Sequence, residues 1–421
     1  MRMESEAYRM AVSRQFDALR DQEPGRGEER QALERVALEP KQTREFLKKL
    51  DREPPEVQRH FYAYLLSRGK TDQFFADMER HLRHRFYEAR DEIKQVLASL
   101  TQEPEVLPGL FRLIRQTDEG WLAGELIHLC LAFEPEHLAK AVEKALATRD
   151  YLLQCLAIYL AGQSGHPRLA EVLVAFYRKP EGEKLDRLES KSRDALLEAG
   201  KKLPVSVIRQ WLADGNSRVR KVGVEVARSR EMVETAVDLV RLVLVDAKNR
   251  DDAATTLLAL EEAGLELRDG GQGAAEVGQL LRQARADAME KAIKILARQG
   301  GEAVRQVALR LIDFLPSEEL LSEARRMAVE DRSIAVQRDA LDLLLRRDRK
   351  VLLDALVQVA ESKGSSLAPE LRERLEAIVE GSLTQAEREE LRSRVEEKRQ
   401  RWARALDQYS TDVEWWRRES D

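Results

Sequence analysis

The chain has 421 residues, of which 43% are apolar, 35% are charged and 5% are aromatic. Leu, Ala, Val, Glu and Arg dominate, which is typical of amphipathic helices and argues against a mainly β protein. The formal net charge of −5 comes from 71 basic and 76 acidic side chains interspersed along the chain. This balance excludes an overall attraction to nucleic acid or to anionic lipid, although a local basic patch stays compatible with it.

The N-terminal residues Met1 to Met10 are charged and lack the apolar core of a signal peptide, and no segment approaches the length of a transmembrane helix. We therefore expect a cytoplasmic protein. The two cysteines, Cys130 and Cys155, both lie in apolar helical segments, which predicts small buried side chains and excludes a disulfide framework.

The first segment, residues 1–40, contains one polar helix near Ser5 to Asp21. A charged segment with Gly and Pro, QEPGRGEER, follows this helix and predicts a linker. We place a repeat array at residues 41–381 and a C-terminal segment at residues 382–421. The ends of a repeat array must differ from its middle because they cap the stack.

Within the array, helices of about 10 to 16 residues alternate with short connections rich in Gly, Pro, Asp, Asn or Ser, and no strand is expected. Four segments, which share a terminal glycine, predict helix ends in which this glycine takes the left-handed conformation: YLAG at 159–162, LLEAG at 196–200, LEEAG at 260–264 and LARQG at 296–300. Their spacing indicates a repeat of about 30 to 38 residues with two helices, and such units must stack to bury their apolar faces.

Residues 214–227, DGNSRVRKVGVEVA, resemble the second helix of a HEAT repeat, with an aspartate, a short gap and the pair Val219-Arg220. Val304-Arg305 repeats this pair, and the segment that starts at Asp331 keeps the aspartate but carries its arginine one residue late, at Arg338. The resemblance to the HEAT or armadillo-like family covers about two thirds of the chain. It implies an all-α, right-handed α-solenoid of stacked antiparallel helix pairs.

In HEAT repeats this arginine usually pairs with an aspartate of its own or the adjacent repeat, so the resemblance implies a structural ladder. Its members here are Asp214, Arg220, Arg305, Asp331 and Arg338. Contacts with phosphate are the other interpretation of these arginines. A separate local basic turn at Arg346, Arg347 and Arg349 is a candidate surface for an acidic partner or for DNA.

The C-terminal segment opens with a capping box, Thr384-Gln-Ala-Glu387, which predicts a long amphipathic helix with Leu391, Val395, Trp402 and Leu406 on one stripe. This helix either seals the last repeat or packs on a partner. Aromatic and basic side chains dominate interface hot spots. The tail therefore predicts either docking onto the array or a partner anchor through Trp415, Trp416, Arg417 and Arg418.

Motifs for catalysis, cofactors or metals are not convincing. Gly69-Lys70-Thr71 lacks the earlier glycine of a phosphate-binding loop, and Gly270-Gly-Gln-Gly273 lacks the third glycine of a dinucleotide fingerprint. Glu125 and His128 have the spacing of a di-iron helix, but no second copy of this motif exists. We expect no catalytic residue, no cofactor and no metal.

The sequence favours a non-catalytic scaffold or adaptor that binds a protein or peptide in a solenoid groove. A second hypothesis is a nucleic-acid-binding array similar to the alkylpurine DNA glycosylases, for which Arg218, Lys221, Arg305 and Arg310 would line a basic face. A third is a helper similar to the HEAT-type lyases that act on bilin chromophores, which would need an apolar pocket.

Overall fold

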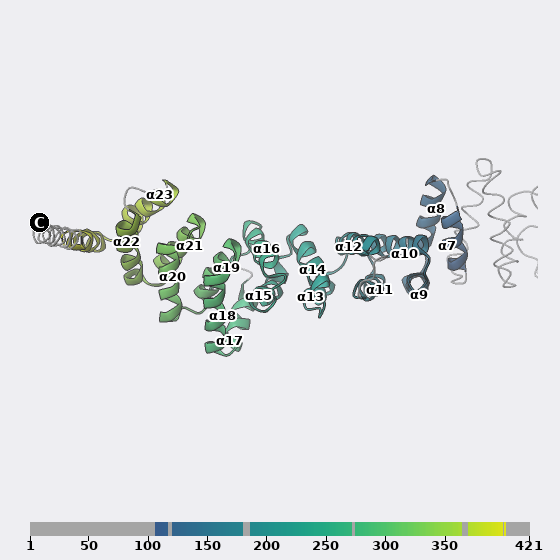
Figure 1. Ribbon diagram of the computed structural model, residues 1–421, viewed down its shortest axis with the longest axis horizontal. Coiled ribbons are helices and arrows are strands. Elements are labelled where there is room, and N and C mark those ends of the chain that lie inside the picture. Colours follow the sequence, from purple (N-terminus) through teal and green to yellow (C-terminus); the bar gives the residue numbers. More distant parts are fainter. Residues whose placement is uncertain are drawn as a thin grey trace, which may run out of the picture. The chain divides into compact units, whose positions relative to one another are not determined.

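The computed structural model describes residues 106–116, 120–179, 186–271, 274–363, 369–398 and 400 (Figure 1). Every regular element in these ranges is a helix, so the all-α prediction is confirmed. None of these helices is long and apolar enough to cross a bilayer. The chain divides into two compact units, Met1–Leu203 (unit 1) and Pro204–Asp421 (unit 2). The predicted segment 1–40 lies outside the described residues, and the other domain boundaries stay predictions.

Unit 1 contains three helix pairs among its described residues: α7 (Leu107–Gln116) with α8 (Gly120–Leu131), α9 (Pro135–Leu146) with α10 (Tyr151–Ser164), and α11 (Pro167–Tyr177) with α12 (Asp186–Gly200). The first helices α7, α9 and α11 contact one another in succession, and the second helices α8, α10 and α12 do the same. The pairs therefore stack in two layers.

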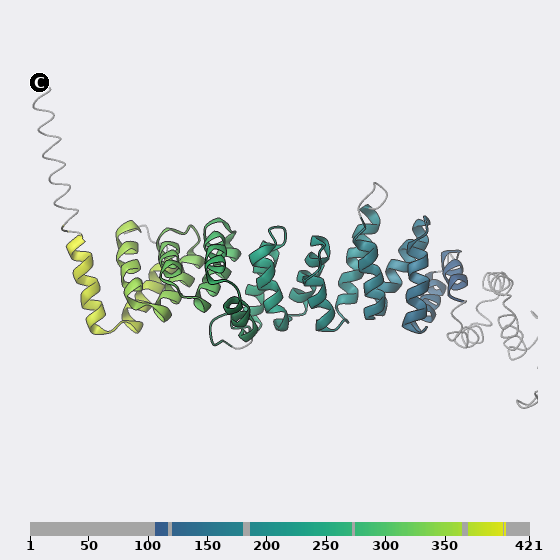
Figure 2. The ribbon, with the colours of Figure 1, turned by 90° about the horizontal axis from the view of Figure 1, so that it is seen from below.

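Unit 2 continues with α13 (Val205–Leu212), α14 (Ser217–Ser229), a short 3-10 turn at Val233–Thr235, α15 (Ala236–Val245), α16 (Arg250–Glu262), α17 (Ala275–Gln283), α18 (Ala286–Gln299), α19 (Glu302–Phe314), α20 (Glu318–Glu330), α21 (Ile334–Arg347), α22 (Arg349–Lys363), α23 (Pro369–Ala377) and a π-helical turn at Ile378–Ser382. First helices α13, α15, α18, α20 and α22 contact one another in succession, as do second helices α14, α16, α19, α21 and α23. The helices of unit 2 thus form two layers of a solenoid, which Figure 1 labels, and α17 is an insertion between repeats. Figure 2 shows the helices of this unit side by side.

Three of the second helices begin where a polar side chain satisfies a free backbone N–H group. The carboxylate of Asp150 accepts hydrogen bonds from two backbone N–H groups at the start of α10, and Asn216 caps α14 in the same way. Ser333 caps α21. Such caps typically contribute about 1 kcal/mol each, so these short polar turns fix where each second helix starts.

The core lies between the two layers and consists of Leu, Val, Ile and Ala side chains. The helix spacing of Val304, Ala308 and Leu311 brings all three into this core, where they are fully buried. Trp211 is also buried. Burial of aliphatic side chains stabilises the stack by about 1.5–3 kcal/mol for each Leu, Ile or Val.

Only one of the four predicted glycine helix ends has the predicted conformation. Gly264, after α16, has φ of 107°. Gly200 is the last residue of α12 without a positive φ, and Gly300 has an extended backbone with φ of −72°. Gly162 lies inside α10, which ends three residues later at Gly165 with φ of 60°. The prediction of a helix end at Gly162 was wrong because the helix is stopped by the next glycine.

The C-terminal capping box has the expected geometry. The backbone N–H of Thr384 donates to the Glu387 carboxylate (2.7 Å), and the backbone N–H of Glu387 donates to the Thr384 hydroxyl (3.3 Å). The helix that follows is described to residue 398, and it pairs with α22 through Arg349–Glu387 (2.9 Å) and through Arg394–Asp354. These contacts place the described part of this helix against the last repeat, while Trp402 and Leu406 lie outside the described residues.

Candidate functional site

A side chain at the fourth residue of a second helix returns to the turn that precedes it. Gln154 of α10 donates to Thr148 O (2.8 Å), and Gln337 of α21 donates to Asp331 O (2.6 Å). The arginines of α14 and α19 do the same, Arg220 to Asp214 O (2.7 Å) and Arg305 to Gly300 O (2.8 Å). These bonds satisfy backbone carbonyls that the end of the first helix leaves without a partner.

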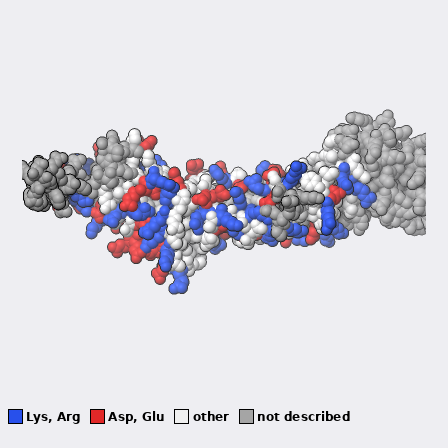
Figure 3. Space-filling model, in the orientation of Figure 1, with Lys and Arg blue, Asp and Glu red and all other residues white. Residues whose placement is uncertain are grey.

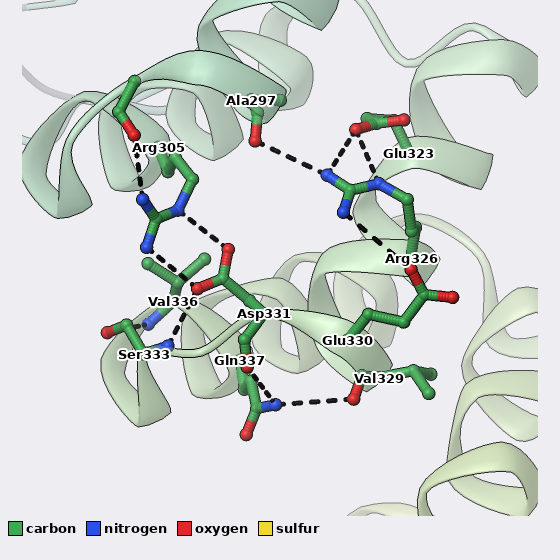
Figure 4. Close-up of polar contacts among 11 residues, drawn as sticks. Ala297, Arg305, Glu323, Arg326, Val329, Glu330, Asp331, Ser333, Val336 and Gln337 are labelled. Atoms are coloured by element: carbon green, nitrogen blue, oxygen red, sulfur yellow. Dashed lines mark hydrogen bonds and ion pairs between the residues drawn. The ribbon is translucent and has the colours of Figure 1, made fainter. Parts of the chain in front are cut away.

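The two arginines among these four residues also reach the next repeat, and together with their partners they form the turn ladder. Arg305 makes a two-pronged pair with the Asp331 carboxylate at 2.8 and 3.0 Å (Figure 4). Arg220 pairs with Asp246 at 2.6 Å rather than with the carboxylate of Asp214. The Asp214 carboxylate instead accepts from the backbone N–H of Asn216 in its own turn (2.8 Å).

Arg338 does not occupy the ladder position. Its side chain is exposed, and the buried fourth position of α21 belongs to Gln337. A shift of one residue rotates a side chain by about 100° around a helix, which turns Arg338 toward solvent. The late arginine in the sequence is therefore a surface residue, and its neighbour binds the turn.

A second set of ion pairs, the first-helix ladder, connects successive first helices in unit 2. Its pairs are Arg209–Asp238 (2.7 Å), Arg298–Glu323 (2.9 Å) and Arg325–Asp354 (3.8 Å). Burial raises the pKa of Glu323, but hydrogen bonds from Arg298 and Arg326 more than offset this effect and leave the pKa below its usual range. No pattern in the sequence indicates this ladder, because its members carry no repeated motif.

A third set, the second-helix ladder, connects successive second helices in unit 2. Its pairs are Lys221–Asp252 (3.6 Å), Arg310–Asp339 (2.9 Å) and Arg374–Asp342 (2.6 Å). Part of it lines a pocket of about 240 Å³, whose lining consists of Glu261, Leu265, Glu266, Leu267, Arg268, Arg310, Asp339, Asp342 and Arg346. The lining is mostly charged, which differs from the apolar pocket that a chromophore-handling helper would need.

Two carboxylates share one guanidinium at this pocket. Arg310 donates through Nε to Glu261 (3.1 Å) and through Nη1 to Asp339 (2.9 Å). Burial raises the pKa of Glu261, and the Arg310 charge only partly offsets this effect because the negative charge of Asp339 is also close. The ionised form of Glu261 therefore lowers the free energy of unfolding at neutral pH.

We expect Glu261→Gln to leave the free energy of unfolding at neutral pH unchanged or raised by up to about 1 kcal/mol, because the amide keeps an acceptor for Arg310 without a buried charge. A raised folded-state pKa means that the cost of ionised Glu261 is present above that pKa and disappears as the pH falls toward 4.5, the ordinary pKa of a glutamate. Urea titrations of both proteins should therefore converge on acidification. If the variant lost more than about 1 kcal/mol of the free energy of unfolding at neutral pH, burial would not be the dominant effect on the ionised Glu261.

The basic turn predicted to meet a partner is bound within unit 2. Arg347 pairs with Asp313 at 2.5 Å, Arg346 lies 3.7 Å from the same carboxylate, and Arg349 pairs with Glu387. Partner binding by these arginines stays a prediction, and it would have to compete with these contacts. The predicted anchors Trp415, Trp416, Arg417 and Arg418 lie outside the described residues.

The arginines predicted to line a DNA-binding face are also engaged. Arg305 is buried against Asp331, Arg310 is held by two carboxylates, and Lys221 lies 3.6 Å from Asp252. Figure 3 shows basic and acidic side chains interspersed over the visible face of the described residues. A phosphate backbone would have to displace these carboxylates, which costs much of the electrostatic gain.

Unit 1 presents a different surface on α10. Five side chains, which we call the α10 stripe, lie on one face of this helix at i, i+1, i+4, i+5 and i+8: Tyr151, Leu152, Cys155, Leu156 and Tyr159. Leu152 is 57% exposed, Tyr159 49% and Tyr151 40%, and the other two are half-buried. The prediction that Cys155 is a buried side chain was therefore wrong, whereas Cys130 is buried and burial raises its pKa to about 12.

In three second helices of unit 2 the equivalent positions carry polar or charged groups. The fifth and ninth residues are Lys221 and Glu225 in α14, Gln306 and Arg310 in α19, and Arg338 and Asp342 in α21. In α10 they are Cys155 and Tyr159. The face of α10 that corresponds to the second-helix ladder of unit 2 is thus apolar and uncharged. The sequence does not indicate this exposed face, because a helix that is apolar on all sides is typically buried.

No cluster of His, Cys, Asp and Glu in the described parts of the chain could hold a metal ion. The candidate pair Glu125 and His128 lies on α8, and His128 is exposed. Gly270 lies in the loop between α16 and α17 with φ of 75°. The segment around Gly69 lies outside the described residues.

No protein-family model and no curated protein sequence matches the chain. Among solved structures, the crystal structure of Kap121p bound to Nup53p is similar, with 11% sequence identity and a TM-score of 0.31. The match covers 86% of this chain and 46% of that chain, so this chain spans about half of its length. The stacked helix pairs and the two helix layers make the described part of each unit a HEAT-like helical solenoid.

Proposed function

We propose that the protein is a non-catalytic scaffold and that it binds a protein partner on the second-helix face of unit 1, at the α10 stripe. The observation that carries this proposal is the exposure of Tyr151, Leu152 and Tyr159 on a helix that has no charged residue between its ends. Exposed contiguous apolar surface is rare on soluble proteins and is typical of interaction sites. Tyrosine is among the residue types that contribute most to binding.

The charge distribution of unit 2 supports this choice of site. Its three ladders pair basic and acidic side chains of successive repeats, so the charged groups of these ladders already have partners in the stack. A partner that binds there must replace existing pairs. A partner that binds the α10 stripe removes apolar surface from water without breaking a charge pair, at a gain of about 25 cal/mol per Å² of apolar surface.

A displayed library of random 16-residue peptides, selected on the full chain, tests this function. We expect enriched peptides whose affinity falls by at least about tenfold in the variant Tyr151→Ser/Tyr159→Ser, since truncation of hot-spot residues costs about 1.4 kcal/mol or more. The two tyrosines are 40% and 49% exposed, so the variant should keep its free energy of unfolding within about 1 kcal/mol.

The matched control is Lys221→Ser/Glu225→Ser, which changes the fifth and ninth residues of α14 in unit 2. The selected peptides should bind this control with unchanged affinity. A selection without enriched sequences, or peptides that lose affinity for the α14 variant and not for the α10 variant, would contradict the proposal.

A further inference from the structure

The neighbours of the α10 stripe indicate which kind of partner it fits, an inference that rests on the proposed function. The adjacent second helix α8 contacts α10 and carries Gly120 and Gly124 at its first and fifth positions. A Cβ atom at either glycine would meet no atom within 4 Å. The apolar side chains of α10 thus stand beside a helix face without side chains at these positions, where the backbone of a partner can approach closely.

The charges at one end of the stripe are basic. A hydrogen bond with Cys155 and partial burial raise the pKa of the Tyr151 hydroxyl. The positive charge of Arg187 in α12 lowers this pKa and opposes the rise. Arg149 is exposed and lies two residues before Tyr151. Asp150 lies between Arg149 and Tyr151, but its carboxylate caps the N-terminus of α10 and pairs with Arg115 (2.6 Å), so Arg149 and Arg187 leave this end with a net positive charge. An acidic group of a partner is therefore favoured at the Tyr151 end.

The shape of the stripe matches a helix. From Tyr151 to Tyr159 it extends about 12 Å, which corresponds to slightly more than two helical turns. Its side chains lie in two rows at i, i+4, i+8 and i+1, i+5, and such ridges fit into the grooves of another helix. The remaining sides of α10 are already packed in this way by α7, α8, α9, α11 and α12.

We infer that the α10 stripe binds a short amphipathic helix of a partner protein, with its apolar face on Tyr151, Leu152 and Tyr159 and an acidic residue at the end near Arg187. The helix backbone lies over the open glycine face of α8. The glycines admit close approach, the stripe supplies the apolar contact, and Arg187 with Arg149 sets the direction in which the helix binds. The partner is thus defined by an apolar face of two turns and a negative charge at one end.

Three fluorescein-labelled peptides of 16 residues test this inference by fluorescence anisotropy with the full chain. The first is an amphipathic helix with Leu at i, i+3, i+4 and i+7 and two Glu residues at one end. The second has Lys in place of both Glu residues, and the third has two central prolines that prevent the helix. We expect the second peptide to bind at least fivefold more weakly than the first, and the third at least tenfold more weakly.

Two variants locate the contacts. Arg187→Glu should reverse the preference between the Glu and Lys peptides. Gly124→Gln should weaken the first peptide at least fivefold while the thermal stability of unit 1 stays equal or rises, because glutamine is a better helix former than glycine. Arg338→Glu, a charge reversal at an exposed position of unit 2, is the control and should change nothing.

The outcomes separate this inference from the proposed function. If library peptides bind in a manner that depends on Tyr151 and Tyr159, but the proline peptide binds as well as the helix or the charge swap has no effect, the scaffold function stands and the helical partner is wrong. If no peptide of either kind depends on the two tyrosines, both proposals fall.

Discussion

Arg305→Met should lower the free energy of unfolding of unit 2 by about 3–5 kcal/mol, because it leaves the Asp331 carboxylate buried without its partner. The side chains of Arg305 and Asp331 are only 7% and 5% exposed, so water cannot replace the lost guanidinium. The variant also loses the hydrogen bond to Gly300 O (2.8 Å). Urea unfolding followed by circular dichroism gives the size of the loss, and hydrogen exchange at the amides of α19 and α21 shows where it acts.

The matched control is Arg338→Met in the same layer. Arg338 is exposed, and a substitution there should change the free energy of unfolding by no more than about 0.5 kcal/mol. In the double variant Arg305→Met/Asp331→Asn part of the loss should return, because the buried charge is removed while the amide can still accept from the backbone N–H of Ser333. Equal losses in Arg305→Met and Arg338→Met would contradict the turn ladder as the structure shows it.

The sequence predicted the second helices of the repeats well. Val219-Arg220 and Val304-Arg305 do open second helices, and the pair Arg305–Asp331 forms as the resemblance implied. The partner of Arg220 could not be predicted, because Asp246 belongs to a repeat without the Val-Arg pair. A ladder between repeats depends on which turns are stacked, and the spacing of a degenerate repeat does not determine this.

The candidate site was less predictable than the fold. The segment YLLQCLAIYLA indicates an apolar helix, and all-round apolar character is usually a sign of burial. Which face of α10 stays uncovered depends on how its neighbours pack, and α8 has a glycine at its fifth position, where α14 and α19 have long side chains. Exposure is thus a property of the stack and not of the segment.

The helix crossing between α10 and α12 explains why Gly162 is a glycine although it ends no helix. A Cβ atom at this position would lie 2.8 Å from the Cβ of Ala195 and 2.9 Å from its Cα and carbonyl oxygen. Real Cβ atoms essentially never approach other atoms so closely. Two of these contacts are with backbone, which cannot rotate away, so a larger residue must push the helices apart.

We therefore expect Gly162→Ala to lower the free energy of unfolding of unit 1 by about 1–3 kcal/mol, and Gly162→Leu to lower it further. The same change at Gly124 should raise the free energy by about 0.5–1 kcal/mol, since a Cβ there meets open space and alanine is the better helix former. The same substitution is thus expected to lower the free energy of unfolding in α10 and to raise it in the neighbouring helix α8. Urea unfolding of the two variants measures both changes.

Ala195→Gly provides the test of cause. Ala195→Gly removes the Cβ atom that a side chain at position 162 would meet at 2.8 Å. Gly162→Ala should therefore lower the free energy of unfolding less in a chain that carries Ala195→Gly than in the chain with Ala195. The coupling between the two positions should be at least about 0.5 kcal/mol, as for residues in direct contact. Additive effects, or a Gly162→Ala variant as stable as Gly124→Ala, would show that α10 and α12 do not cross at these two residues.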